Sequence, residues 1–180
     1  MSQAEAMFEA RVFHTDWGYI GAVAGRRGLV RLTLPCPAEA DCQAALGEHA
    51  ESEAGLSRLL DQVEREIGEY LAGRRRSFTL PIDLTGMPVF RRRVLEQLRE
   101  IGHGQYTTYG ALAKAVGTPR ATRAVGGAMA TNPLSLIIPC HRVLASGGRL
   151  NGFAGGLALK QRLLELEGLT VDQGRVVKTG

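Results

Sequence analysis

The sequence predicts an α+β protein, with a small amino-terminal α/β domain that has an antiparallel sheet and a mostly helical carboxyl-terminal domain with a helix-turn-helix. Residues 12–35 alternate apolar and polar side chains, as half-buried strands do. Residues 55–73 carry an apolar stripe of helical period. The second half consists of short helical patterns separated by glycine and proline. We place the domain boundary near Gly86, which gives domains over 1–85 and 86–169 and a tail over 170–180.

The elements of the first domain follow from turn signals and periodicity. Gly25 and Gly28 divide the segment 12–35 into two or three short antiparallel strands. A helix should follow, ending at Gly73 and burying one apolar stripe, which consists of Leu56, Leu59, Leu60, Val63, Ile67, Tyr70 and Leu71. The stretch "RRRSFTLPIDLTGMP", residues 74–88, is interpreted as a strand and a connector.

Three helices are predicted at the start of the second domain. The first covers residues 88–102, with Pro88 near its start. The second, "TTYGALAKAVG", should end at Gly117. The third is expected to begin with Thr118 as its N-cap and to stop at Asn132-Pro133. Because the last two are short and joined by a glycine-containing turn, they predict a helix-turn-helix.

Two adjacent glycines lie inside the third of these helices. Glycine costs about 1 kcal/mol relative to alanine in a helix interior, so Gly126 and Gly127 need a reason. One reason is that a partner approaches the backbone closely, and the other is close packing of two helices. The sequence leaves both interpretations open.

Charge is distributed unevenly along the chain. The formal net charge is +4. Residues 1–86 carry 9 basic and 13 acidic side chains, whereas residues 87–180 carry 13 basic and 5 acidic ones. Residues 101–164 contain no Asp or Glu, which suits a polyanionic partner, although a merely basic surface is the alternative. The basic residues of that stretch are Lys114, Arg120, Arg123, Arg142, Arg149, Lys160 and Arg162.

Several classes of protein are disfavoured by the composition. No apolar run reaches the roughly 18 residues of a membrane span, and the amino terminus has no basic region followed by an apolar block. We therefore expect a cytoplasmic protein whose cysteines are thiols. Cys36 and Cys42, with His14 and His49 nearby in sequence, match no strong zinc template, so no metal site is predicted.

A candidate nucleophile stands in the apolar stretch "LIIPCHRVL", residues 136–144. A lone cysteine in such a run is often only a small buried side chain. Here Pro139 ends the strand-like run, so Cys140 should lie at a bend, and the adjacent His141 can favour the thiolate. The pair therefore predicts nucleophilic chemistry.

A carboxylate that could orient the histidine is found in "LALKQRLLELEGL", residues 157–169. Glu167 follows Leu163 by four residues and so shares the inner, apolar face of this helix, whereas Glu165 points away. A solvated carboxylate at a helix end is the plainer alternative. On the first interpretation Cys140, His141 and Glu167 form a nucleophile–base–orienter relay.

Four motifs together resemble the methylated-DNA–protein-cysteine methyltransferases, the 6-O-alkylguanine-DNA alkyltransferases. They are "TTYGALAKAVG", "RAVGGAM", "NPLSLIIPCHRVL" and "GFAGGLALKQRLLELEG", and the resemblance as a whole spans about residues 86–168. The resemblance implies that Cys140 accepts an alkyl group irreversibly from 6-O-alkylguanine in DNA, and the sequence leaves open whether 4-O-alkylthymine is a further substrate. It also implies that His141 acts through a water as the base and that Glu167 orients it.

The resemblance implies further contacts. Tyr109 would crowd a phosphate and help to protonate the leaving guanine, and Arg123 would fill the gap left by the extruded nucleotide. Asn132 would tie the helix-turn-helix to the active-site turn. Other DNA contacts would come from Gly110, Thr118, Gly126, Gly127 and Ser146. The base pocket would be lined by Met129, Val143 and Phe153.

The implied partner is double-stranded DNA that carries alkylated guanine, bound by a monomer of which several copies can load on one duplex. Neither a cofactor nor a metal is implied, and extrusion of the base by a minor-groove helix fits the chemistry. Phe153 stands where the family usually has Tyr, and Ala130 where it has a basic or polar residue, so affinity or substrate range should differ.

Two other functions remain open from the sequence. The first is a module that binds lesions without chemistry, against which the presence of Cys140 argues. The second is a cysteine hydrolase, which would turn over many times.

Overall fold

An antiparallel sheet of three strands is the centre of the amino-terminal unit. The computed structural model describes residues 8–47 and 56–177, and the chain divides into two units, residues 1–85 and 86–180. The strands β1 (Phe8–Thr15), β2 (Gly18–Gly25) and β3 (Gly28–Leu32) are ordered β1-β2-β3. Two-residue turns join them, and the second turn lies between Gly25 and Gly28, where these glycines predict it. At Gly28 φ is +142°, and a Cβ there would lie 2.7 Å from the Pro81 backbone, so only glycine fits.

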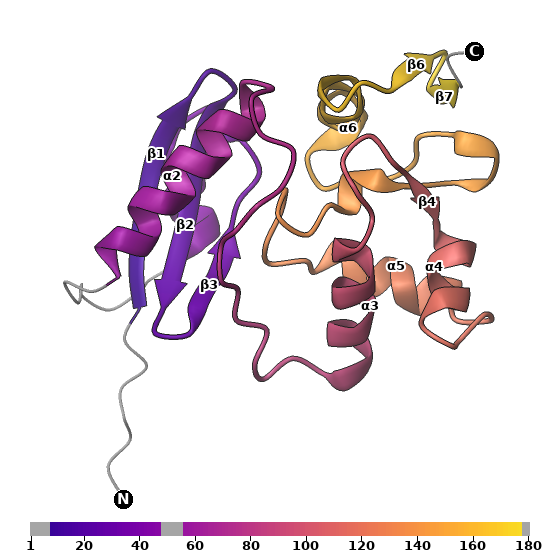
Figure 1. Ribbon diagram of the computed structural model, residues 1–180, viewed down its shortest axis with the longest axis horizontal. Helices are drawn as coiled ribbons and strands as arrows, with labels where there is room; N and C mark the ends of the chain where they lie inside the picture. Colours follow the sequence, from indigo (N-terminus) through magenta and orange to yellow (C-terminus); the bar gives the residue numbers. More distant parts are fainter. Residues whose placement is uncertain (1–7, 48–55, 178–180) are drawn as a thin grey trace, which may run out of the picture. The chain divides into compact units, whose positions relative to one another are not determined.

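Two helices belong to this unit. The predicted helix is α2 (Ser57–Leu71), which lies along one face of the sheet and buries Leu60, Val63 and Ile67 (Figure 1). The other, α1 (Glu39–Leu46), was not predicted, because it has no apolar stripe. It is held by two buried side chains one turn apart, Cys42 and Leu46.

The strand predicted within residues 74–88 is absent from the structure. This segment makes only an isolated parallel bridge, in which Leu29 N donates to Pro81 O and Asp83 N donates to Leu29 O, both at 2.9 Å. Glu66, buried in α2, accepts hydrogen bonds from the backbone and hydroxyl of Thr79. The hydrogen bonds from Thr79 to the Glu66 side chain therefore hold this connector in place, although it is not a strand of the sheet.

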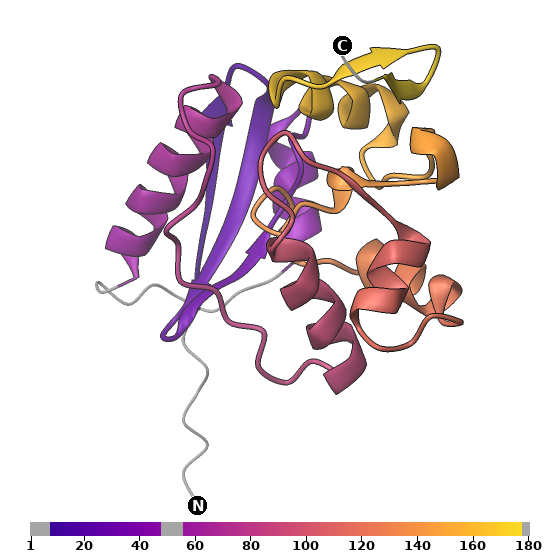
Figure 2. The same cartoon turned by 45° about the vertical axis from the view of Figure 1, so that its right-hand side comes forward.

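The second unit begins with helices and is mostly helical, as predicted. Its helices are α3 (Val89–Arg99), α4 (Tyr109–Ala115), α5 (Thr122–Ala130) and α6 (Gly156–Leu166), with 3₁₀ turns η1 (Cys140–Arg142) and η2 (Ser146–Gly148). Strand β4 (Thr107–Thr108) pairs in parallel with β5 (Val143–Leu144). Figure 2 shows α3, α4 and α5 clustered together, with α6 on the other side of the β4–β5 pair. Their common core includes Val94, Leu95, Leu98, Leu112, Val125 and Leu134.

The turn between α4 and α5 corrects one prediction. Thr118 does not cap α5, whose first residue is Thr122. Instead Thr118 N donates to Ala113 O at 2.9 Å and Gly117 N to Lys114 O at 3.0 Å, with Gly117 at φ +77°. This is the Schellman arrangement that closes a helix. Thr118 therefore belongs to the end of α4, and the N-cap of α5 is Ala121, three residues later than the sequence predicts.

The last residues form structure where only a tail was predicted. Strands β6 (Thr170–Asp172) and β7 (Arg175–Val177) form an antiparallel hairpin. Val176 packs with Leu144 and Leu164 in a small core cluster, which Tyr106 and Leu169 help to cover. The hairpin is thus attached to the second unit by buried apolar contact. No helix in the described part of the chain is long and apolar enough to cross a membrane.

Candidate active site

Cys140 lies at the bend that Pro139 predicted, as the first residue of η1. Its backbone N–H donates to Ile138 O at 2.9 Å. Asn132, just beyond the end of α5, holds the preceding loop from both sides of its amide: Nδ2 donates to Ile138 O at 2.8 Å, and Oδ1 accepts from Leu134 N at 3.1 Å. The helix-turn-helix and the cysteine turn are therefore connected through one side chain.

The loop held by Asn132 contains an unusual backbone conformation. Leu136 has φ +69°, a region that a leucine rarely adopts, and its side chain is buried. Such a conformation costs on the order of 1–3 kcal/mol and persists only where surrounding contacts determine it. Here the contacts are the two Asn132 bonds and the bond from Ile138 N to Leu134 O at 2.9 Å.

A mainly apolar cavity of about 420 Å³ opens in front of the cysteine. Most of its wall is small or aromatic, and it is lined by Tyr109, Gly126, Met129, Ala130, Cys140, Gly152, Phe153 and Ala154. Two of the three predicted pocket residues, Met129 and Phe153, are therefore present. Val143 is not: it is fully buried in the core and does not line this cavity.

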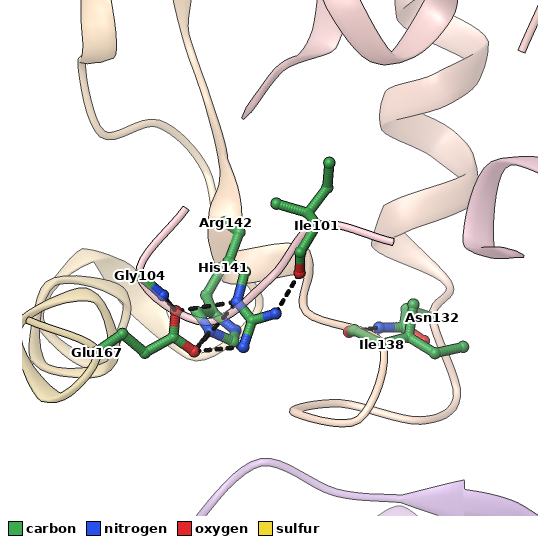
Figure 3. A network of polar contacts seen from close by, with 7 residues as sticks. All are labelled: Ile101, Gly104, Asn132, Ile138, His141, Arg142 and Glu167. Atoms are coloured by element: carbon green, nitrogen blue, oxygen red, sulfur yellow. Dashed lines mark hydrogen bonds and ion pairs between the residues drawn. The ribbon is translucent and has the colours of Figure 1, made fainter. Parts of the chain in front are cut away.

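Glu167 is the centre of a buried polar network (Figure 3). It lies directly after α6 on the inner side, and Glu165 is exposed, as predicted. His141 Nε2 lies 2.9 Å from Glu167 Oε1, and the Arg142 guanidinium reaches both carboxylate oxygens, with Nη2 2.6 Å from Oε1 and Nε 2.9 Å from Oε2. Gly104 N donates to Oε2 at 3.2 Å, and Arg142 Nη1 also donates to Ile101 O.

These contacts determine the protonation states of Glu167 and His141. Burial alone would raise the pKa of Glu167, but the hydrogen bonds from His141 and Arg142 outweigh it and hold that pKa far below its ordinary value. The ionised carboxylate can only accept, so His141 Nε2 carries the proton and donates it. Burial lowers the pKa of His141, although the negative charge of Glu167 acts in the opposite direction. Because the pKa is lowered, the imidazole is neutral at neutral pH. Its Nδ1 is then the nitrogen that can take up a proton.

Arg142 and Lys160 are site residues that sequence reasoning counted only as surface charge. Lys160 is fully buried in α6, where Nζ donates to Val143 O at 2.6 Å and Asn151 O at 3.1 Å. Burial lowers the pKa of Lys160 to about 8, so most of the ammonium is charged at pH 7. Because Lys160 and Arg142 are both internal, neither belongs to the basic surface. Position in a helical stripe could have revealed Lys160, since it follows Leu157 and Leu159 and precedes Leu163 and Leu164.

The thiol itself experiences opposing effects. Burial raises the pKa of Cys140, while the Asn132 amide and the positive charge of Lys160 lower it, and the net pKa lies above the ordinary value. The resting group is therefore a thiol at neutral pH. A base must take its proton during any attack, which makes the neutral imidazole of His141 relevant.

The surface of the helix-turn-helix is open at the positions predicted to meet DNA. Gly110, Arg123 and Gly127 are exposed, and so is Ser146 in η2. A Cβ built at Gly127 would meet nothing within 4 Å, and one at Gly126 would meet only the Tyr109 ring, at 3.8 Å. Close helix–helix packing therefore does not explain the two glycines. The Thr118 hydroxyl oxygen, by contrast, is buried, and no hydrogen-bond partner for it is found among the described residues.

The remaining cysteines form no metal centre within the described residues. The Cys42 thiol donates to Tyr19 O at 3.1 Å, and burial raises the pKa of Cys36 to about 11. In the described ranges no group of three or more His, Cys, Asp or Glu side chains could hold a metal ion. His49 lies outside those ranges.

Comparison with known proteins agrees with this geometry. A family model described as the DNA-binding domain of 6-O-methylguanine DNA methyltransferase matches residues 89–169. A methylated-DNA–protein-cysteine methyltransferase of Methanosarcina acetivorans is 43% identical over 107 residues, covering 59% of this chain and 68% of that protein. The chain belongs to this methyltransferase family. The corresponding protein of Mycolicibacterium paratuberculosis is 44% identical over 102 residues, which cover 57% of this chain and 61% of that protein.

Solved structures are similar to this chain over both of its units. The O6-methylguanine methyltransferase of Mycobacterium tuberculosis has a TM-score of 0.69 and 31% identity, covering 89% of this chain and 93% of that one. A complex of the M. tuberculosis protein with DNA has a TM-score of 0.67 and 33% identity, with 88% and 91% covered. The predicted fold class and enzyme class are thereby confirmed.

Proposed function

We propose that this methyltransferase repairs duplex DNA by moving the alkyl group of 6-O-alkylguanine irreversibly to Sγ of Cys140, with 4-O-alkylthymine as a second substrate. The observation that carries the proposal is the position of Cys140. Its thiol stands in the wall of a cavity large enough for a base, and a neutral imidazole backed by a carboxylate belongs to the same turn. No cofactor is needed, because the substrate itself supplies the alkyl group.

The substrate base must leave the duplex to reach Cys140. An alkylated guanine within a duplex hides its oxygen, and extrusion costs a few kcal/mol. The cavity opens beside Gly126 and Ala130 of α5, so a base flipped next to this helix would enter directly. Arg123, exposed on α5, would fill the gap left in the base stack, and Gly126 and Gly127 would let the helix press into a minor groove. Ser146 and Gly110 would contact phosphates.

The chemical step balances through the residues of the site. Cys140 gives its proton, through a water, to His141 Nδ1, and the resulting imidazolium is stabilised by Glu167. The sulfur attacks the alkyl carbon, the bond from that carbon to O6 of guanine breaks, and the leaving base takes a proton from the Tyr109 hydroxyl. Lys160 and Asn132 assist by lowering the pKa of Cys140 against the effect of burial. Water does not hydrolyse the thioether formed, so each molecule reacts once.

Replacement of Gly127 by alanine should separate stability from DNA binding. Nothing lies within 4 Å of the added methyl group, and alanine is favoured over glycine in a helix by about 1 kcal/mol, so the melting temperature should stay or rise. Affinity for duplex DNA should nevertheless fall several-fold, because the methyl group would intrude on the groove. Thermal unfolding and DNA titration measure the two effects.

The matched control is Gly68→Ala in α2, where a Cβ would also meet nothing within 4 Å. It should gain similar stability and leave DNA affinity unchanged. Full DNA affinity of Gly127→Ala would contradict groove binding by α5.

The proposed function is tested by reaction with an excess of duplex DNA that holds one 6-O-methylguanine per molecule. The peptide containing Cys140 should gain the mass of one methylene group, and the amount of guanine repaired should plateau at one equivalent of protein. Bound DNA with an unchanged peptide mass would indicate a lesion-binding module. Repair well beyond one equivalent would indicate a turnover enzyme and overturn the single-use mechanism.

A further inference from the structure

The carboxyl-terminal hairpin lies beside the predicted DNA-contacting turn at Ser146. Leu150 N donates to Gly174 O at 2.8 Å, and an isolated antiparallel bridge joins Arg149 and Arg175. A Cβ at Gly148 would lie 3.2 Å from Val176 O, so the two segments are in close contact. Figure 1 shows β7 next to the orange loop that follows β5. The buried Val176 fixes the hairpin in this place.

The turn η2 lies at the same edge of the β4–β5 pair as the start of the helix-turn-helix. Strands β4 and β5 are parallel, with Thr107 opposite Val143 and Thr108 opposite Leu144. Their carboxyl ends therefore meet at one edge. β4 leads directly into α4 at Tyr109, and β5 leads into Ser146. Residues attached to the η2 turn thus lie at the border of the surface proposed to bind DNA.

Two arginines face each other at that border. Arg149 and Arg175 are both exposed, and like charges opposite each other across a strand pair destabilise it. Within the described residues neither guanidinium has a hydrogen bond or an ion pair. Asp172 is the partner of Arg175 in β6, but Arg175 Nη2 is directed instead toward the turn, 3.8 Å from a Cβ position at Gly147.

We propose that Arg149 and Arg175 form a phosphate-binding site that extends the DNA interface from the helix-turn-helix onto the carboxyl-terminal hairpin. The site rests on the proposed function. A phosphate of the DNA backbone would supply the anion that the facing arginines lack. The exposed residues of the neighbouring turn, Ser146 and Gly147, have small side chains or none, so a DNA strand has room to approach. Arg175 lies outside residues 89–169, so the hairpin adds a contact beyond the segment that the family model matches.

The test is the salt dependence of duplex binding by Arg149→Gln, Arg175→Gln and the unaltered protein. Each phosphate contact contributes about −0.9 to the slope of log affinity against log salt. Either substitution should therefore make the slope shallower by about one and weaken binding several-fold at low salt. The rate of reaction with the free base 6-O-methylguanine should stay the same, because neither arginine lines the cavity.

Arg92→Gln is the matched control. Arg92 is an exposed arginine of the same unit, but it already has a carboxylate 3.7 Å away in Glu96. Its slope should equal that of the unaltered protein. Slopes unchanged in both hairpin variants, with the unaltered protein binding normally, would overturn the phosphate site alone. If the unaltered protein binds no duplex and acquires no alkyl group, the proposed function itself fails.

Discussion

Cys140→Ser should lower the rate of alkyl transfer by more than about a thousandfold while leaving the fold and DNA binding intact. Serine keeps the shape of cysteine, but its hydroxyl yields almost no alkoxide near neutral pH. The site already has to remove a proton from a thiol whose pKa is raised by burial, and it has one neutral imidazole with which to do so. The rate is measured in a single turnover with duplex DNA that contains 6-O-methylguanine.

Cys36→Ser provides the control for this substitution. Cys36 is a half-buried thiol of the other unit, with a pKa raised to about 11, so its loss should not change the rate of transfer. DNA binding by Cys140→Ser should match that of the unaltered protein. A rate close to the original one in this variant would mean that another group accepts the alkyl group.

The fold was predictable wherever a local pattern decides the structure. Alternation and glycine turns specify the three strands, and the apolar stripe specifies α2. The missed helix α1 has no stripe, and its position depends on Leu46 fitting against Gly21, a contact between distant residues. The hairpin 170–177 was missed for a similar reason, since its short strands depend on Val176 packing against Leu144 and Leu164.

Two features of the candidate site were predictable, one from residues adjacent in sequence and one from helical spacing. These place Cys140 at its bend and turn Glu167 inward. They could not show that Arg142 shares the Glu167 carboxylate with His141, because only the tertiary structure decides which side chains of the cysteine turn reach that carboxylate. Helical spacing does place Lys160 on the apolar stripe of its helix, but it could not show which groups hold the buried ammonium, since these oxygens belong to Val143 and Asn151. A charge count treats both basic residues as surface until the tertiary structure is known.

Glu167→Gln should be harmful in two separable ways. The glutamine is neutral, so the nearly buried guanidinium of Arg142 loses its counter-charge, and removal of one partner of a buried ion pair costs about 3–5 kcal/mol. The amide can also donate to His141, which favours the tautomer in which Nδ1 already carries hydrogen and cannot accept the thiol proton. The transfer rate should then fall by about a hundredfold to ten thousandfold.

The pH dependence of stability follows from the same contacts. Because the pKa of Glu167 in the folded protein lies far below its ordinary value of 4.5, its contribution to stability is complete above that value and is lost as pH falls toward the folded pKa. The difference in unfolding free energy between the unaltered protein and Glu167→Gln should thus be constant near neutrality and shrink below about pH 4.5. Denaturant unfolding across this range measures it.

The double variant Glu167→Gln, Arg142→Met separates the two effects. Removing both charges leaves no unpaired ion in the interior, so much of the lost stability should return, as it does when a buried pair is replaced by apolar side chains. The transfer rate should remain low, since the glutamine still fails to hold His141 in the required tautomer. Recovery of the rate along with the stability would show that Glu167 serves the fold alone, and His141 would then have to act without an orienting carboxylate.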